Sequence, residues 1–231
     1  MREIVLLIVI CMAILSCQNR TDAGHLTNDK KQESSVIKTN LTKVNDSLIV
    51  GSIYGPNIWE TYFKPHRTPS GAIIKLQVIN DSLYLIQWGD STHIHTYPRI
   101  FYLNGHESWI PKYKDENNNY IVLDEGCGSP CWVGIFLPKA DRLSAFEAHE
   151  YLGYDLDKFL VAYIKDTNSI EIYNLKTRQI DDHIVNGCVS AFLGYCIDSL
   201  KIENGYLTYK WFPNAEKEAK KGIIKREKIK I

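Results

Sequence analysis

Residues 159–174 read FLVAYIKDTNSIEIYN, and this stretch decides the fold. Two short runs of β-branched and aromatic residues, 159–164 and 169–173, lie on either side of the polar segment 166–168. Such residues favour strands, whereas Asp and Asn favour the turns that connect strands. The stretch therefore predicts two antiparallel strands joined by a tight turn.

The same spacing continues on both sides of this hairpin. Further runs occupy residues 145–151 and 179–185, so four short strands fall within about forty residues. Four antiparallel strands at this spacing are typical of one blade of a propeller, although any β-meander has a similar sequence pattern. An incomplete propeller-like stack and a β-sandwich are therefore both open.

Short runs of this kind recur along most of the chain, and only residues 139–150 contain a cluster of helix formers. Asn-Gly pairs at 104–105 and 204–205 favour tight hairpins. We therefore expect an all-β, mostly antiparallel domain, with the polar segment 112–119 (KYKDENNN) as a solvated loop. The other expected strands are 47–54, 59–63, 72–79, 83–88, 92–103, 120–123, 132–137, 200–202, 206–211 and 223–231.

The first residues have the features of an export signal. Arg2 precedes the apolar run 4–15, which is too short to cross a hydrocarbon core roughly 30 Å thick but matches the apolar region of a signal peptide. Residues 14–17 read Ile-Leu-Ser-Cys and resemble the lipobox of bacterial lipoproteins. The resemblance implies cleavage before Cys17 and attachment of a diacylglycerol, with palmitate among the acyl chains, to that residue. An ordinary cleaved signal and an uncleaved anchor are the alternatives.

The lipoprotein resemblance divides the chain into three parts. We expect a signal peptide at 1–16, a lipidated cysteine and flexible polar tether at 17–43, and a single β-rich domain at 44–231. Two or more acyl chains suffice for stable anchoring, so the lipid on Cys17 would be the membrane contact. In lipoproteins, an Asp directly after the lipidated cysteine favours retention at the inner membrane. Because this chain has Gln18 there, the resemblance favours the outer membrane of the cell envelope and leaves open whether the domain faces the periplasm or the surface.

The composition excludes one class of partner. The chain carries 27 Lys and Arg and 27 Asp and Glu, so its formal net charge is zero. No net field draws such a chain to nucleic acid, and we expect no nucleic-acid partner. Aromatic residues make up 11% of the chain, which favours a packed core over disorder.

Six cysteines are present, of which Cys11 lies in the leader and Cys17 is the expected lipid site. The remaining even number, in an oxidising compartment, predicts disulfides. Short spacings favour pairing between neighbours, although pairing between the two groups is open, and a zinc site is the alternative. The four residues are Cys127, Cys131, Cys188 and Cys196.

Residues 124–132 (DEGCGSPCW) are the most distinctive segment of the sequence. Their glycines and proline predict a shaped hairpin end, and they resemble the Gly-Cys-Gly-x-x-Cys hairpin of an uncharacterised family of secreted bacterial proteins. Redox cysteines usually have Cys-x-x-Cys spacing at a helix N-terminus, which this loop lacks. We therefore interpret the loop as a structural clip that could also carry a recognition surface.

His93 and His95 would point to one face of a strand, but no third ligand is placed beside them, so we predict no metal site. Nucleophile-elbow, phosphate-loop and dinucleotide motifs do not occur, and we predict no cofactor. The leading hypothesis is a non-catalytic envelope module that has a structural role or binds a protein or glycan. The rivals are a hydrolase whose site is scattered over strand ends and an inhibitor or immunity-type protein acting through the cysteine loop.

Overall fold

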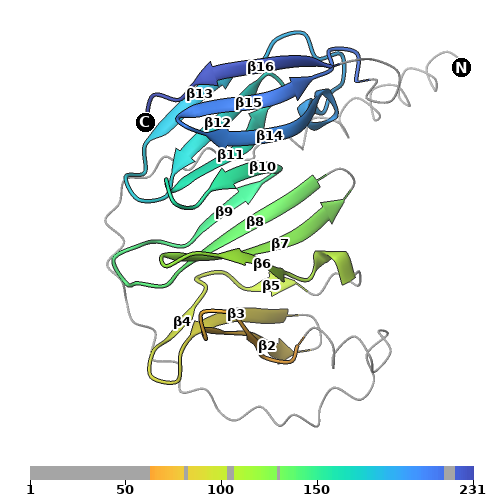
Figure 1. Ribbon diagram of the computed structural model, residues 1–231. Helices are drawn as coiled ribbons and strands as arrows, with labels where there is room; N and C mark the ends of the chain where they lie inside the picture. The colour runs from red at the N-terminus through yellow and green to blue at the C-terminus, as the bar shows by residue number, and fades with distance from the viewer. Residues whose placement is uncertain (1–62, 81–82, 103–106, 129–130, 216–221) are drawn as a thin grey trace, which may run out of the picture. The chain divides into compact units, whose positions relative to one another are not determined.

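The computed structural model describes residues 63–80, 83–102, 107–128, 131–215 and 222–231. The leader, Cys17, the tether, the strand expected at 47–54 and all but the last residue of the strand expected at 59–63 lie outside the described residues, so the predictions about them stay predictions. The described part is all-β, as predicted, with four antiparallel sheets (Figure 1) and two 3₁₀ turns, η1 (Glu107–Trp109) and η2 (Leu193–Cys196). Within it, no helix is long and apolar enough to cross a membrane.

The chain builds the sheets one after another. In the second, third and fourth sheets the strand order equals the chain order, which makes each a meander. The first sheet contains β1 (His66–Arg67), β2 (Ile73–Asn80), β3 (Leu83–Gly89), β4 (Ile94–Thr96) and β5 (Phe101–Tyr102). The second contains β6 (Lys112–Glu116), β7 (Tyr120–Gly128), β8 (Cys131–Pro138) and β9 (Phe146–His149). The third contains β10 (Tyr151–Asp155), β11 (Leu160–Asp166), β12 (Ser169–Asn174) and β13 (Ile180–Ile184), and the fourth β14 (Ile197–Glu203), β15 (Tyr206–Trp211) and β16 (Ile223–Lys228).

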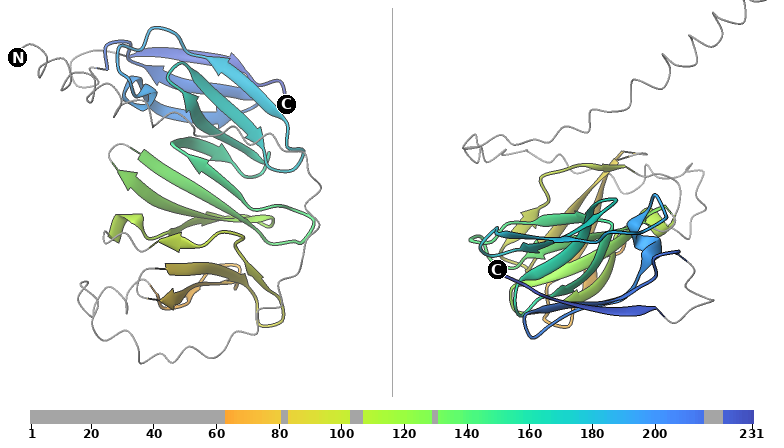
Figure 2. Two further views of the ribbon diagram at one scale, coloured as in Figure 1. Left: turned by 180° about the vertical axis from the view of Figure 1, so that it is seen from behind. Right: turned by 90° about the horizontal axis from the view of Figure 1, so that it is seen from above.

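The sheets lie one upon the next in chain order, as the two side views show (Figures 1 and 2). Strand β7 explains why this stacking is stable. Ile121 and Leu123 pack in the apolar cluster toward the first sheet, whereas Tyr120 and Val122 pack in the cluster toward the third sheet. A third cluster joins the third and fourth sheets. Each neighbouring pair thus packs face to face as in a sandwich, and the inner two sheets are buried on both faces.

The strand expected at 145–151 is divided between two sheets. Strand β9 ends at His149, and β10 begins at Tyr151. Glu150 between them adopts a φ of 52°, a conformation that non-glycine residues rarely take and that turns the chain sharply. Composition does not show this break, because the residues on both sides favour strands.

The expectation of a solvated loop at 112–119 is wrong for its first half. Residues 112–116 form β6, which pairs with β7 and is an edge strand of the second sheet. An edge strand has one partner and several exposed side chains, so it tolerates Lys, Asp and Glu. The expected strand at 92–103 is also corrected, since it contains the two short strands β4 and β5.

Both disulfides connect neighbouring cysteines. Cys127 pairs with Cys131 across a Cα–Cα distance of 5.1 Å. Cys188 pairs with Cys196 across 5.9 Å. The pairing between neighbours, which the short spacings favour, is therefore the one that the structure shows.

Candidate functional site

The Cys127–Cys131 hairpin separates two cavities. It closes the end of β7 and β8, where the register shifts between Gly126 and Gly128. Gly128 has a φ of 114°, which favours a residue without a Cβ. One cavity of about 450 Å³ lies toward the third and fourth sheets, and another of about 470 Å³ lies toward the first. We call the 450 Å³ cavity the disulfide cleft and the 470 Å³ cavity the glutamate pocket. Cys127 lines both cavities.

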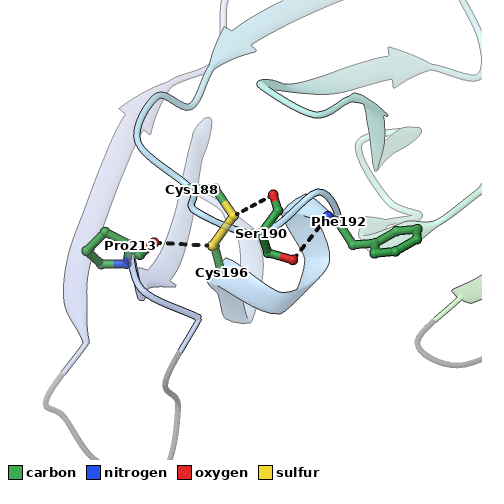
Figure 3. Close-up of a disulfide and its surroundings, with 5 residues drawn as sticks. All are labelled: Cys188, Ser190, Phe192, Cys196 and Pro213. Carbon is green, nitrogen blue, oxygen red and sulfur yellow. Dashed lines mark hydrogen bonds between the residues drawn. A yellow bond between two sulfur atoms is a disulfide. The ribbon is translucent and has the colours of Figure 1, made fainter.

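The disulfide cleft has exposed aromatic side chains contributed by two separate elements. Trp132 follows the first disulfide on β8 and is 51% exposed, and Phe192 is 55% exposed. The second disulfide closes the segment that carries Phe192, whose backbone N–H donates to Ser190 Oγ at 3.1 Å (Figure 3). The complete lining is Cys127, Gly128, Cys131, Trp132, Glu150, Tyr151, Leu152, Ile164, Phe192, Gly194, Ile197, Asp198, Ser199 and Leu200.

The polar side of this cleft comes from an irregular part of β14. Ser199 has a φ of 53°, and the β14–β15 register shifts between Asp198 and Lys201. Strand β14 packs beside β10 at Gly153, where an added Cβ would lie only 3.1 Å from Leu200 Cδ2. A side chain at position 153 would therefore require the Leu200 side chain to shift by a few tenths of an ångström.

The glutamate pocket contains a carboxyl group among aromatic rings. Glu125 on β7 and His149 on β9 both lie opposite Val133 of β8. Val133 packs toward the first sheet, so this row of side chains faces the same way. The complete lining is Tyr84, Arg99, Ile100, Phe101, Tyr102, Trp109, Glu125, Gly126 and Cys127.

Glu147 holds the basic groups beside this pocket. Its Oε1 lies 2.9 Å from Arg99 Nη1 and 2.8 Å from His149 Nε2, and its Oε2 accepts from the Tyr97 hydroxyl at 3.3 Å. Burial raises the pKa of Glu147, but the hydrogen bond from His149 and the Arg99 charge outweigh it and the pKa is lowered. The same hydrogen bond raises the pKa of His149.

Glu125 has the opposite environment. Its Oε2 is buried and has no hydrogen-bond partner among the described residues. Burial and the nearby charge of Glu147 raise the pKa of Glu125 to about 7, although Arg99 and His149 oppose the shift. Two neighbouring carboxyl groups thus differ in ionisation near neutral pH, because one is paired with cations and the other is not.

The two histidines singled out in the sequence, His93 and His95, both line one small pocket beside Trp88. His93 is exposed and precedes β4, whereas the His95 ring stacks on Trp88 with centroids 5.2 Å apart. His95 Nδ1 lies 3.5 Å from the exposed Asp141. No group of three metal-ligating side chains occurs in the described ranges.

Sequence reasoning found the cysteine loop and missed Arg99, Glu125, Glu147 and His149. The sequence did contain one indication, the alternation of side chains between the two faces of a strand. Glu147 and His149 are polar residues two apart in an expected strand, and Glu125 is two residues after Leu123. Alternation places residues on one face of a strand but does not indicate which strands are neighbours.

No protein-family model matches the chain, and no curated protein matches it either. Function must therefore be argued from the geometry of the site.

Proposed function

We propose that this is a lipid-anchored cell-envelope protein whose β domain is a non-catalytic binding module, with the disulfide cleft as its binding surface. The observation that carries the proposal is the pair Trp132 and Phe192, which remain more than half exposed while lining one cleft. Aromatic side chains supply a large contact area at small entropic cost and are enriched at binding sites.

The scaffold around the cleft supports this function. One disulfide closes the segment that contains Phe192, and the other ends at Cys131, directly before Trp132. Rigid segments lose less conformational entropy on binding, which increases affinity. The volume of about 450 Å³ is also within the usual range of ligand sites.

Envelope localisation rests on the lipobox and is supported by the disulfides, which form in oxidising compartments. Substituting Cys17→Ser and fractionating the cells tests the anchor. We expect the variant to leave the membrane fraction, because the acylated side chain is lost. Unchanged processing and full membrane retention of the variant would contradict the lipid anchor.

Binding is tested with the mature chain carrying Cys17→Ser, mixed with isolated envelope material and sedimented. We expect the wild-type cleft to co-sediment and the Trp132→Ala, Phe192→Ala double variant to bind at least about tenfold more weakly. Ile184→Ala is the control, because Ile184 is 63% exposed on β13 and does not line the cleft. Equal binding by all three proteins would overturn the role of the cleft.

A hydrolase is the second candidate, and the divergent pKa values of Glu125 and Glu147 favour it. Enzymes often pair a protonated carboxyl group with an ionised one as acid and base. The sedimentation experiment separates the two functions, since a hydrolase would release soluble fragments with time. Fragments released by the wild type and not by Glu125→Gln would overturn the non-catalytic assignment.

A further inference from the structure

The charged side chains that line the disulfide cleft all have the same sign. Glu150 and Asp198 contribute carboxyl groups, whereas none of the described lining residues is Lys, Arg or His. Both residues are partly buried, and neither carboxylate forms an ion pair within the described part of the chain. The cleft is therefore a locally acidic site in a chain whose formal net charge is zero.

Two basic residues directly follow lining residues of the cleft, and both are already paired elsewhere. Lys165 Nζ lies 3.2 Å from Glu171 Oε2 and 3.0 Å from Asp182 Oδ1. Lys201 Nζ lies 3.9 Å from Glu203 Oε1. The carboxylates of the cleft thus keep their charge uncompensated. In a partly desolvated cleft such charge attracts a cation more strongly than it would in open water.

Exposed aromatic rings line the same cleft. Trp132 is 51% exposed and Phe192 is 55% exposed. The face of an aromatic ring attracts cations, and tryptophan does so most strongly. Rings together with carboxylates are complementary to an ammonium or guanidinium group on an aliphatic stem, because the stem packs on the rings while the charge meets the carboxylates. A neutral ligand would leave those carboxylates without a partner, and an anionic ligand would be repelled.

The disulfide cleft adjoins a second hollow of about 360 Å³, which we call the side groove. The residues that line both are Trp132, Tyr151 and Leu152. The two charged residues of the side groove, Lys114 and Asp124, are paired with each other at 2.7 Å. The side groove therefore adds contact surface with little net charge, next to the acidic cleft. A ligand longer than a single amine would use both.

We propose that the disulfide cleft binds the Lys or Arg side chain of a basic polypeptide segment, with the neighbouring part of that segment in the side groove. This proposal rests on the proposed binding function and adds the chemical class of the ligand. The ammonium or guanidinium group pairs with the carboxylates of Glu150 and Asp198, and its aliphatic stem packs on Trp132. Charge thus provides the specificity, and the aromatic rings provide the contact area.

The test measures fluorescence anisotropy of labelled, end-blocked octapeptides with the full mature chain carrying Cys17→Ser. The peptides alternate alanine with lysine, arginine, serine or glutamate. We expect the lysine and arginine peptides to bind at least about tenfold more tightly than the serine peptide, and the glutamate peptide not to bind. Added salt should weaken binding of the basic peptides, because it screens partly exposed ion pairs.

Equal affinities for the basic and serine peptides, or no binding of either basic peptide, would overturn the cationic ligand. The proposed function would still stand if the wild type co-sediments with envelope material and the Trp132→Ala, Phe192→Ala variant does not. A blocked single lysine, used as a competitor, tests the side groove. We expect it to compete at least about tenfold more weakly than the unlabelled lysine octapeptide, and equal competition would overturn the polypeptide in favour of a small amine.

Isosteric variants then locate the bound cation. Glu150→Gln and Asp198→Asn each remove one charge and keep the shape of the side chain. We expect each to weaken binding of the lysine peptide by about threefold or more, to leave the serine peptide unchanged and to reduce the salt dependence. Glu203→Gln is the matched control, because Glu203 is also on β14 but is 65% exposed and does not line the cleft. Thermal unfolding verifies that all variants fold. Equal weakening by all three substitutions would mean that the peptide responds to overall charge, and would overturn the site.

Discussion

At the scale of single residues, Glu125 makes the pH dependence of stability predictable. Burial and Glu147 raise its pKa from 4.5 to about 7. The folded state therefore binds more protons than the unfolded chain between these values, and stability falls as the pH rises through this window. A shift of this size corresponds to about 3 kcal/mol.

We accordingly expect Glu125→Gln to raise the free energy of unfolding at pH 8 by up to about 3 kcal/mol and to leave it unchanged near pH 4. Urea unfolding across the pH range measures this. Glu203→Gln is the matched control, since the Glu203 side chain is 65% exposed at the end of β14. Parallel pH profiles for wild type and Glu125→Gln would contradict the unpartnered environment of Glu125.

Glu116 behaves in the opposite way. Although burial raises its pKa, the hydrogen bonds from Lys139 and Ser70 hold it at about 2, below the usual 4.5. Lys139 Nζ lies 2.6 Å from Oε2, and the Ser70 backbone N–H donates to Oε1 at 2.6 Å. These bonds join the β1–β2 turn to β6 of the next sheet.

We expect Glu116→Gln to lower the free energy of unfolding at pH 7 by about 1–2 kcal/mol, allowing for solvent screening. The wild type should lose this advantage as the pH falls from 4.5 toward 2, whereas the variant should respond less. Thermal unfolding from pH 7 to pH 2 measures both. Asp157→Asn, at an exposed turn position, should not change the profile; an equal effect of the two substitutions would refute the bridge.

At the scale of elements, the sequence predicts strands well and sheet membership poorly. The 159–174 hairpin forms as expected, as β11 and β12, because its residue preferences are local. The β9–β10 break depends on the positive φ of Glu150, which side-chain preferences do not reveal. Likewise β6 is polar because it is an edge, which requires knowing its neighbours. The cysteine loop could be predicted because its residues are consecutive in the sequence, whereas Glu125, Glu147 and Arg99 come together only through tertiary packing.

The second disulfide should stabilise its segment and position Phe192. A closed loop of this length contributes about 2–3 kcal/mol in the chain-entropy model. We expect the Cys188→Ser, Cys196→Ser double variant to unfold at a correspondingly lower denaturant concentration and to bind envelope material more weakly than Ile184→Ala. If binding is unchanged while stability falls, the disulfide stabilises the fold without shaping the cleft.

At the scale of the molecule, a buried network fastens the third sheet to the fourth. His183 on β13 lies 2.8 Å from Glu227 Oε2 on β16 and 3.1 Å from Asp181 Oδ2. The Tyr209 hydroxyl donates to Glu227 at 2.8 Å, and the Lys230 backbone N–H donates to Asp181 at 2.8 Å. His183 and Asp181 are both buried, so loss of the imidazole would leave polar groups without partners, which costs about 1–3 kcal/mol.

In a stack where each sheet packs mainly on its neighbours, such damage should remain local. We therefore expect His183→Ala to speed amide hydrogen exchange in β14, β15 and β16 by about tenfold or more, while β7 and β8 keep wild-type protection. His93→Ala, at an exposed position directly before β4, is the control. Because residues of β14 line the disulfide cleft, His183→Ala should also weaken the binding of envelope material there. Uniformly faster exchange in all four sheets would instead mean that the stack unfolds as one cooperative unit, and that the disulfide cleft cannot be loosened without the other sheets.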